Sequence, residues 1–486
     1  MQKKAFVSKV FQMSSVMLIM NISNICYSIF VSKRAGAAGI GMFHLVMSIY
    51  SLAVTISVSG IGLTSTRLIS DMPSPLAVKC ADSVVIKCIK LCLVPASAAC
   101  FFLFYASDFI STNILNNPEC SICLKILSPT LICTAVSSVI NGYFTSFGRV
   151  GSIAMGRIFA ECSVWLCTIL LLPMYSGDKT YMAVVIAFCS GLIADCICSI
   201  TLWRRSVNHL WCENGTDYKS ILRLCTPIAI GSYLRTGLTS AENILIPSML
   251  SLFGSTNPVA AYGIIKGMTI PILMFPTVFT GAFTSFIVPE IARRRFMGYK
   301  NGIKYISALS IEYILKFAFF VSAVFLRWHM ELGEAFFDEA DVGKYLGIMF
   351  VFPLFYFCDS VVDAILKGMD EQVASLKINI VDSICRVAGI VIFVPRFGVM
   401  AYLGIMYLSE FINLGFSYLK LKKSSGVLFP LKKGVIYPLL SSTLAIFISC
   451  RIPSLGMWSD ICFFGAIYIS ILCLIQSVFD KISMQD

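Results

Sequence analysis

The chain has 486 residues, of which 57 % are hydrophobic and 13 % are charged, and its formal net charge is +12. Apolar runs recur along it, and each has about the 20 residues that an α-helix needs to cross a bilayer. This pattern excludes a soluble globular protein, and the continuous runs exclude a barrel, whose strands alternate apolar and polar residues. We therefore predict an all-α polytopic membrane protein.

The apolar runs predict about fourteen transmembrane helices. Turn residues separate them, for example AGAAG at 35–39, LNNPE at 115–119 and GSTNP at 254–258. No connection is long enough to form a soluble domain. The predicted spans cover residues 6–32, 39–65, 84–109, 124–147, 153–175, 180–203, 220–250, 258–287, 304–328, 343–367, 373–395, 399–419, 434–452 and 457–479.

The positions of lysine and arginine predict the orientation, because cytoplasmic loops collect these residues. With the N-terminus inside, the predicted inner segments hold most of them, and the loop ELGEAFFDEADVGK (331–344) is an acidic outer loop. We expect a plasma-membrane protein with both termini cytoplasmic. The net charge then needs no nucleic-acid partner, since anionic lipid attracts such residues. The inner basic residues are Lys3, Lys4, Lys9, Arg204, Arg205, Arg293, Arg294, Arg295, Lys300, Lys420, Lys422, Lys423, Lys432 and Lys433.

Several enzyme signatures are missing from the sequence. It contains no G-x-x-x-x-G-K-[ST], no H-E-x-x-H and no G-x-S-x-G, and its three histidines are far apart. A glycosyltransferase would usually bring a soluble domain or long catalytic loops. We therefore expect a transporter, not an enzyme, and neither a cofactor nor a metal site.

The two halves of the chain resemble each other. The segment AAGIGMFHLVMSIYSLAVTISVSGIGLTSTRLISD (37–71) parallels VAAYGIIKGMTIPILMFPTVFTGAFTSFIVPEIAR (259–293): both begin with small residues and end with Thr-Ser before a charged end. Transporters are often built from such repeats. We predict two pseudo-symmetric six-helix lobes around a central cleft. The predicted parts are an N-lobe at 1–203, a cytoplasmic connection at 204–219, a C-lobe at 220–423, and two further helices with a short tail at 424–486.

Three segments resemble a known family. YGIIKGMTIPILMFPTVFTGAFTSFIVPEIARR (262–294), ENILIPSML (242–250) and YLSEFINLGFSYLKLKK (407–423) are similar to the stage V sporulation protein B group. That group belongs to the multidrug/oligosaccharidyl-lipid/polysaccharide exporter superfamily. The resemblance implies a fourteen-helix, two-lobed flippase-like fold that exports lipid-linked saccharides by alternating access. Residues 151–157 depart from the Pro-Thr-Ala-x-Ser-Gln stretch of many relatives, so no family residue is transferred there.

Charged residues inside the spans are the candidate functional residues. A charge at the bilayer centre costs at least about 2.5 to 3.5 kcal/mol, so such residues normally face a partner or a watery cavity. Arg235, Thr239 and Glu242 lie at i, i+4 and i+7, on one helix face. Glu242 and Lys266 each lie twelve residues from Gly254, which puts both at a depth of about 18 Å on antiparallel helices. An ion pair between them is expected.

The resemblance places spans 1, 2, 7 and 8 on the central cleft. Arg235 and Lys266 would then donate hydrogen bonds to a pyrophosphate, and an arginine suits phosphate oxygens well. In the alternative, Glu242 and Lys266 form a purely structural pair, and Arg235 bonds carbonyl groups or reaches the interface. Neutral hydrogen-bonding groups for sugars are expected on the first two spans, at Asn21, Asn24, Ser28 and His44.

Further charges occur on spans 10 and 11. Asp359, Asp363 and Lys367 form an i, i+4, i+8 row, either a cation or proton site or a structural network. Asp382 and Arg386 are predicted to pair along their own helix.

These observations predict a flippase-like exporter for a polyprenyl-pyrophosphate-linked saccharide, such as a peptidoglycan precursor in spore or cell-wall synthesis. Its expected partners are this cargo and the lipid bilayer, with cell-wall synthesis enzymes as further candidates. One alternative is a cation-coupled multidrug antiporter of the same superfamily, in which Glu242, Asp359 and Asp363 carry the coupling ion. The other is a non-transporting membrane scaffold for cell-wall synthesis.

Overall fold

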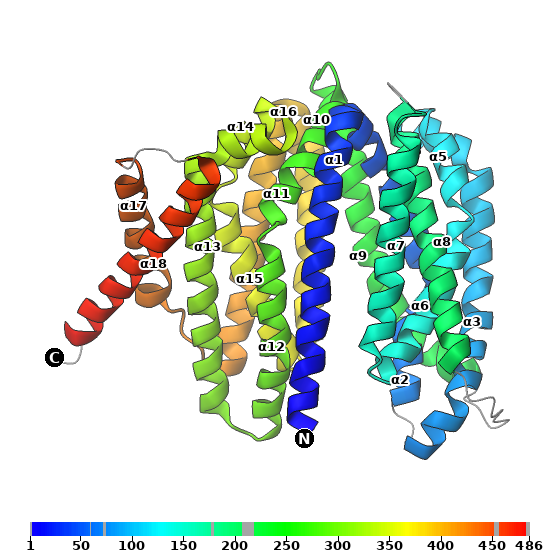
Figure 1. Ribbon diagram of the computed structural model, residues 1–486, viewed down its shortest axis with the longest axis horizontal. Helices are drawn as coiled ribbons and strands as arrows, with labels where there is room; N and C mark the ends of the chain where they lie inside the picture. Colours follow the sequence, from blue (N-terminus) through cyan, green and yellow to red (C-terminus); the bar gives the residue numbers. More distant parts are fainter. Residues whose placement is uncertain are drawn as a thin grey trace. The chain divides into compact units, whose positions relative to one another are not determined.

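The computed structural model describes residues 2–58, 60–70, 74–175, 179–206, 218–451 and 456–482. Helices and short connections make up these residues, and none of them lies in a β-strand (Figure 1). The predicted all-α class is therefore confirmed. The described residues form two compact units: unit 1 runs to Gly263 and includes Ile390–Gly398, and unit 2 comprises Ile264–Gly389 and the residues from Val399 onward.

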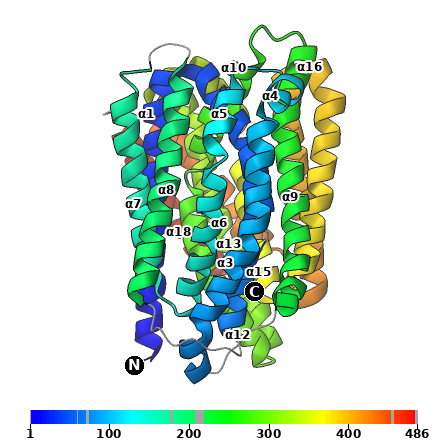
Figure 2. The ribbon, with the colours of Figure 1, turned by 90° about the vertical axis from the view of Figure 1, so that its right-hand side faces the viewer.

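Unit 1 is built from long helices that pack at small residues. Between α7 and α8, for example, Ser163 donates a hydrogen bond of 3.1 Å to Ser190, and Figure 2 shows the two helices side by side. Gly263 permits a closer contact, because a Cβ atom there would lie 1.9 Å from the carbonyl oxygen of Ala37. The elements are α1 (Gln2–Val58), α2 (Ile61–Ser70), α3 (Ser74–Tyr105), α4 (Ser107–Phe109), η1 (Ile110–Ile114), α5 (Cys120–Leu127), α6 (Thr130–Ser146), α7 (Val150–Leu171), α8 (Thr180–Ser206), α9 (Tyr218–Leu252) and α10 (Pro258–Gly263).

Unit 2 holds the remaining helices around an aromatic and aliphatic core. Phe357 and Val361 of α15 are fully buried in it, and Phe317 of α13 stacks on Phe357 with ring centroids 5.9 Å apart. The elements are η3 (Ile264–Thr269), α11 (Ile270–Met274), α12 (Thr277–Phe296), α13 (Lys300–Phe337), α14 (Ala340–Ile348), α15 (Phe352–Gly368), α16 (Gln372–Ser425), η4 (Leu431–Ile436), α17 (Tyr437–Ser449) and α18 (Met457–Ile482).

The described helices support a multi-pass membrane protein. Eight of them are long and apolar enough to cross a bilayer, and the number is eleven if each of three bent pairs is one span. These pairs bend by 43°, 54° and 62°. The count of fourteen stays a prediction, as does the division into lobes at 204–219, of which residues 207–217 lie outside the described residues.

Two of the long helices are interrupted at a glycine where the sequence predicts a connection between spans. Gly36 interrupts α1 with φ 66°, and Gly398 interrupts α16 with φ 62°. The break in α16 reverses the chain, because the side chains of Asn379 and Asn413 are hydrogen-bonded at 3.2 Å. A continuous helix would separate these two residues by about 50 Å. α16 therefore consists of two antiparallel segments.

The prediction of a loop over residues 331–344 is wrong, because most of these residues are helical. Helix α13 continues to Phe337 and α14 begins at Ala340, so only Asp338 and Glu339 connect them. Leu332 and Phe337 are both buried, which gives this acidic stretch an apolar face that keeps it helical. Asp338, in the left-handed conformation with φ 55°, ends the helix.

Candidate functional site

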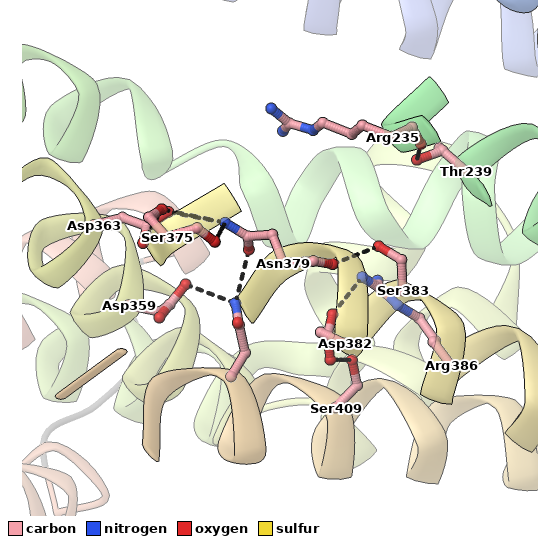
Figure 3. A network of polar contacts seen from close by, with 11 residues as sticks. Arg235, Thr239, Asp359, Asp363, Ser375, Asn379, Asp382, Ser383, Arg386 and Ser409 are labelled. Atoms are coloured by element: carbon pink, nitrogen blue, oxygen red, sulfur yellow. Dashed lines mark hydrogen bonds and ion pairs between the residues drawn. The ribbon is translucent and has the colours of Figure 1, made fainter. Parts of the chain in front are cut away.

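Arg235 occupies the middle of α9, seventeen residues from either end of the helix. Its side chain is exposed and extends away from the helix backbone (Figure 3). Among the described residues, no carboxylate lies within ion-pair distance of it. Thr239, one turn later, is also exposed and donates a hydrogen bond of 3.1 Å to the Arg235 carbonyl oxygen. The middle of this long helix thus presents a cation to its surroundings.

Polar contacts fix the neighbouring face of α9 against α1. Ser240 donates a hydrogen bond of 2.8 Å to the carbonyl oxygen of Ser48, and Thr55 donates one of 3.2 Å to Thr236. Glu242 is only 5 % exposed, so this face is buried where the carboxylate lies. The helix that carries Arg235 is therefore anchored within unit 1.

Lys266 lies in η3, a π-helical turn at the start of unit 2. Its ammonium group lies 5.6 Å from the ring centroid of Tyr402, and the lysine is half-buried. A π-helical turn inside a span often marks a functional position. Glu242 belongs to unit 1 and Lys266 to unit 2, so their pairing stays a prediction.

The predicted sugar-binding residues lie on α1. Asn21 and Asn24 are exposed, whereas His44 is half-buried. Ser23, between the two asparagines, accepts a hydrogen bond of 3.0 Å from Trp165. Its hydroxyl donates a hydrogen bond of 3.4 Å to Glu161. The sequence gives no signal for this contact, because Ser23 is an ordinary small residue in an apolar run.

A polar network surrounds Asp359 and Asp363 inside unit 2 (Figure 3). Asn413 donates hydrogen bonds to Asp359 at 3.0 Å and to Asn379 at 3.2 Å. Asn379 in turn donates to Asp363 at 3.3 Å, and Ser375 donates to the same carboxylate at 2.8 Å. The two acids of α15 are therefore held by both antiparallel segments of α16.

A second group of polar residues lies further along α16. Arg386 donates to Asp382 at 2.9 Å, which confirms the predicted pair. Ser409, from the other segment of α16, donates a hydrogen bond to the remaining oxygen of Asp382. Glu410, next to Ser409 in sequence, is also buried and interacts electrostatically with Arg386.

We call the carboxylates Asp359, Asp363, Asp382 and Glu410, with their hydrogen-bonding partners, the acidic network. Arg386 is the basic residue that forms an ion pair within it, and Lys367, at the end of the predicted row, is exposed. Asp359 is 6 % exposed, and among the described residues its buried Oδ1 atom makes no hydrogen bond of ordinary geometry, although the Ser417 hydroxyl interacts with this carboxylate. A buried carboxylate oxygen with no donor is costly unless a proton or a cation completes it.

The network differs from an ordinary metal site. Within the described ranges, no group of three or more His, Cys, Asp or Glu residues is placed to hold a metal ion. Amide and hydroxyl oxygens supply much of its polar surface instead. Asn379 and Asn413 could not be singled out from the sequence, because a neutral amide in an apolar run carries no charge signal.

Charged residues within long apolar helices commonly mark the substrate or ion pathway of a membrane transporter. The fold has solved counterparts. A structure of the lipid II flippase MurJ in an inward closed conformation matches with a TM-score of 0.76, 12 % identity and coverage of 98 % of this chain and 100 % of that chain. An inward-facing multidrug resistance MATE family transporter of the MOP superfamily matches with a TM-score of 0.64, 15 % identity and coverage of 87 % and 95 %. The fold is therefore the one that these two solved structures share.

Sequence comparison defines the family. The model of the polysaccharide biosynthesis protein family matches residues 6–262, more than half of the chain, and the chain belongs to this family. Stage V sporulation protein B of Bacillus subtilis (strain 168) is 17 % identical over 420 residues, covering 82 % of this chain and 80 % of the relative. Sporulation protein YkvU of the same organism is 21 % identical over 248 residues, covering 48 % and 55 %. The predicted resemblance is confirmed: the chain belongs to the polysaccharide biosynthesis protein family, is similar in sequence to stage V sporulation protein B, and shares its fold with membrane transporters.

Proposed function

We propose that the protein moves a polyprenyl-pyrophosphate-linked saccharide, such as a peptidoglycan precursor, across the membrane by alternating access. The observation that carries this proposal is the exposed guanidinium of Arg235 at the middle of α9, with no ion-pair partner among the described carboxylates. Membership of the polysaccharide biosynthesis protein family supports a saccharide cargo. The similar fold of MurJ, which is described as a lipid II flippase, agrees with it.

The chemistry of Arg235 suits a pyrophosphate. A guanidinium stays charged and can donate two parallel hydrogen bonds to phosphate oxygens. We predict α9 to be a membrane span, although it is not among the described helices that are apolar enough by themselves. A charge inside such a span is costly, so a function that uses the charge of Arg235 accounts for its presence. Lys266 is the second proposed donor to the phosphates, and its half-buried position beside Tyr402 holds it in place.

The saccharide needs neutral hydrogen-bonding groups. Asn21 and Asn24 are exposed on one helix and offer amide donors and acceptors, which sugar hydroxyl groups can use. His44 is the third proposed contact, and Glu242 is proposed to orient Lys266. The peptidoglycan of spores or of the cell wall fits the two sporulation proteins that resemble this chain.

We assign the driving ion to the acidic network. Asp359 and Asp363 are the proposed binding residues for a proton or a monovalent cation, with Asn379, Asn413 and Ser375 as neighbouring oxygen groups. The buried Oδ1 of Asp359 supports this assignment, because a proton or a cation would satisfy it. Binding there would change the charge of unit 2, which is a direct way to bias one conformation over another.

A reconstituted translocation assay tests the cargo site. Wild type, Arg235→Ala, Lys266→Ala and Arg223→Ala proteins would be compared in vesicles that contain a fluorescent lipid-linked disaccharide. Arg223 is the matched control, because it is another exposed arginine of α9 that lies near the helix start. We expect Arg235→Ala to slow translocation by about tenfold or more, since hydrogen bonds to charged groups contribute about 1.5 to 3 kcal/mol. Equal rates for Arg235→Ala and Arg223→Ala would contradict the site.

A cation-coupled multidrug antiporter is the second candidate function. The acidic network and the buried Glu242 favour it, because carboxylates can bind both a coupling cation and a cationic drug. Vesicles loaded with a cationic dye separate the two functions. Dye efflux driven by a cation gradient and unaffected by Arg235→Ala would favour the antiporter. Saccharide movement that Arg235→Ala abolishes, with no dye efflux, would favour the flippase.

A further inference from the structure

A cavity of about 320 Å³ opens at one end of unit 2, away from the residues assigned to transport. It lies where three chain segments meet: the turn from α12 to α13, the turn from α15 to α16, and the end of α16. Arg295 and Lys300 come from the first turn, Glu371 from the second, and Ser424 from the third. The cavity thus combines charged and hydroxyl groups that are far apart in the sequence.

The charges of the cavity wall favour an anion. Lys300 is exposed and has no carboxylate within ion-pair distance among the described residues. Arg295 is half exposed and meets Asp370 through a single contact of 3.2 Å, so most of its donors remain available. The carboxylate of Glu371 is already neutralised by Lys420 at 3.1 Å. The net charge that an incoming ligand meets is therefore positive.

The apolar part of the cavity wall suits a carbon chain attached to such an anion. Ile303 and Met369 are almost fully buried and line the cavity with apolar surface. The hydroxyl of Ser424 lies at the rim, where it donates to Glu371 at 3.2 Å. A phosphate attached to a short carbon chain matches this combination, because the charged head meets Arg295 and Lys300 while the carbon atoms meet Ile303 and Met369.

The surroundings place this cavity at a basic surface. Arg293 and Arg294 precede it on α12, and Lys422 and Lys423 end α16 beside it. Residues of this kind gather at the cytoplasmic face of membrane proteins and attract anionic lipid. The cavity is therefore positioned where a phosphate headgroup of the membrane surface can enter it.

We propose that this cavity binds a phosphate ester, with Arg295 and Lys300 as the residues that contact the phosphate. The ligand is either the headgroup of an anionic phospholipid or a free phosphate compound, since both present the same group. Binding would tie together the α12–α13 turn, the α15–α16 turn and the end of α16. The proposed phosphate binding uses none of Arg235, Lys266, Asp359 or Asp363. It is therefore separate from the proposed transport function, and a negative result for the cavity would leave that function unaffected.

The test measures thermal unfolding of the full-length protein with two probes. The first is nanodiscs of phosphatidylcholine with and without phosphatidylglycerol, and the second is glycerol phosphate or inorganic phosphate added to the detergent-solubilised protein. The site variant is Arg295→Gln with Lys300→Gln. The matched control is Lys422→Gln with Lys423→Gln, which removes the same charge from two exposed residues that do not line the cavity.

We expect phosphatidylglycerol to raise the unfolding temperature of wild type and of the control, and the apparent affinity to fall about tenfold or more only in the site variant. Stabilisation by glycerol phosphate or inorganic phosphate in detergent, lost in the site variant, would identify a soluble ligand instead. An equal loss in the site variant and the control would overturn the proposal, because diffuse surface attraction would then explain the whole effect. No shift with any probe would overturn it as well.

Discussion

Two charged regions of this protein differ in how far their charged groups are exposed and hydrogen-bonded. Arg235 lies exposed at the middle of α9, with no carboxylate partner among the described residues. Asp359 and Asp363 are held by hydrogen bonds from the two segments of α16 inside unit 2. An exposed cation is available to bind a large anionic cargo, whereas enclosed acids can accept only something as small as a proton or a metal cation. The difference suggests that cargo and driving ion use separate sites.

The largest expected effect comes from comparing one substitution in each region in the same translocation assay. Arg235→Ala should weaken cargo movement by about tenfold or more and leave its ion dependence intact. Asp359→Asn keeps the size of the side chain but removes the charge, so it should abolish the ion dependence while cargo binding persists. Rates of saccharide translocation with and without an imposed proton or sodium gradient check both variants. If Asp359→Asn kept its full ion dependence, the acidic network would not hold the driving ion.

The second effect concerns the stability of unit 2. Asp382→Ala removes the carboxylate that accepts the 2.9 Å hydrogen bond from Arg386 and the acceptor of the Ser409 hydroxyl, while Glu410 still interacts with Arg386. Breaking a buried ion pair costs about 3 to 5 kcal/mol, but Arg386 is about a quarter exposed, so we expect about 2 kcal/mol. Denaturant unfolding in detergent measures the loss. Asp341→Ala, which removes an exposed pair with Lys344, serves as the control and should change stability little. Equal losses in both variants would rule out a special role for the Asp382 contact.

A smaller effect is expected at Ser375, whose hydroxyl donates to Asp363 at 2.8 Å. Ser375→Ala removes one hydrogen bond to a half-buried acid and should cost about 1 kcal/mol of unfolding free energy. It should also weaken ion binding if Asp363 is a ligand. Ser383→Ala is the control, because the Ser383 hydroxyl bonds only a backbone carbonyl on the same helix, at 2.8 Å. A change in ion affinity for Ser383→Ala but not for Ser375→Ala would contradict the assignment of Asp363.

The smallest effect is a pH dependence outside the spans. A hydrogen bond from Ser121, and then one from Lys125, hold the pKa of Asp108 below its usual value. Because this pKa is lower in the folded state, the contribution to stability is present above the unfolded value of about 3.9 and is lost as the pH falls through the folded value. Thermal unfolding of wild type and Asp108→Asn between about pH 5 and pH 3 checks this. A wild-type curve parallel to the variant curve would show that the contact does not stabilise the fold.

Local patterns in the sequence predicted a large part of what the structure contains. The predicted spans at 180–203 and 457–479 match α8 and α18 closely, because each is a continuous apolar run. The predicted span at 220–250 matches the bounds of α9, which is less apolar. The turn at 254–258 contains Gly254 with φ 91°, as its residue types indicated. The Asp382–Arg386 pair was also predictable, since residues four apart on a helix always share a face. The acidic stretch 331–344 differs from the prediction, because the buried apolar face of α13 keeps its first seven residues helical despite their charge.

Hydrophobicity and helical spacing act within a few turns, so the amino-acid sequence is enough to predict the membrane class, the positions of most helices and the residues whose charge is costly in a bilayer. The neutral groups that bind the acids depend on how distant segments pack. Asn379 and Asn413 meet because α16 reverses at Gly398, and this contact depends on how two segments pack and not on either segment alone. The cavity beside Arg295 and Lys300 arises in the same way, from three chain segments that are far apart in the sequence.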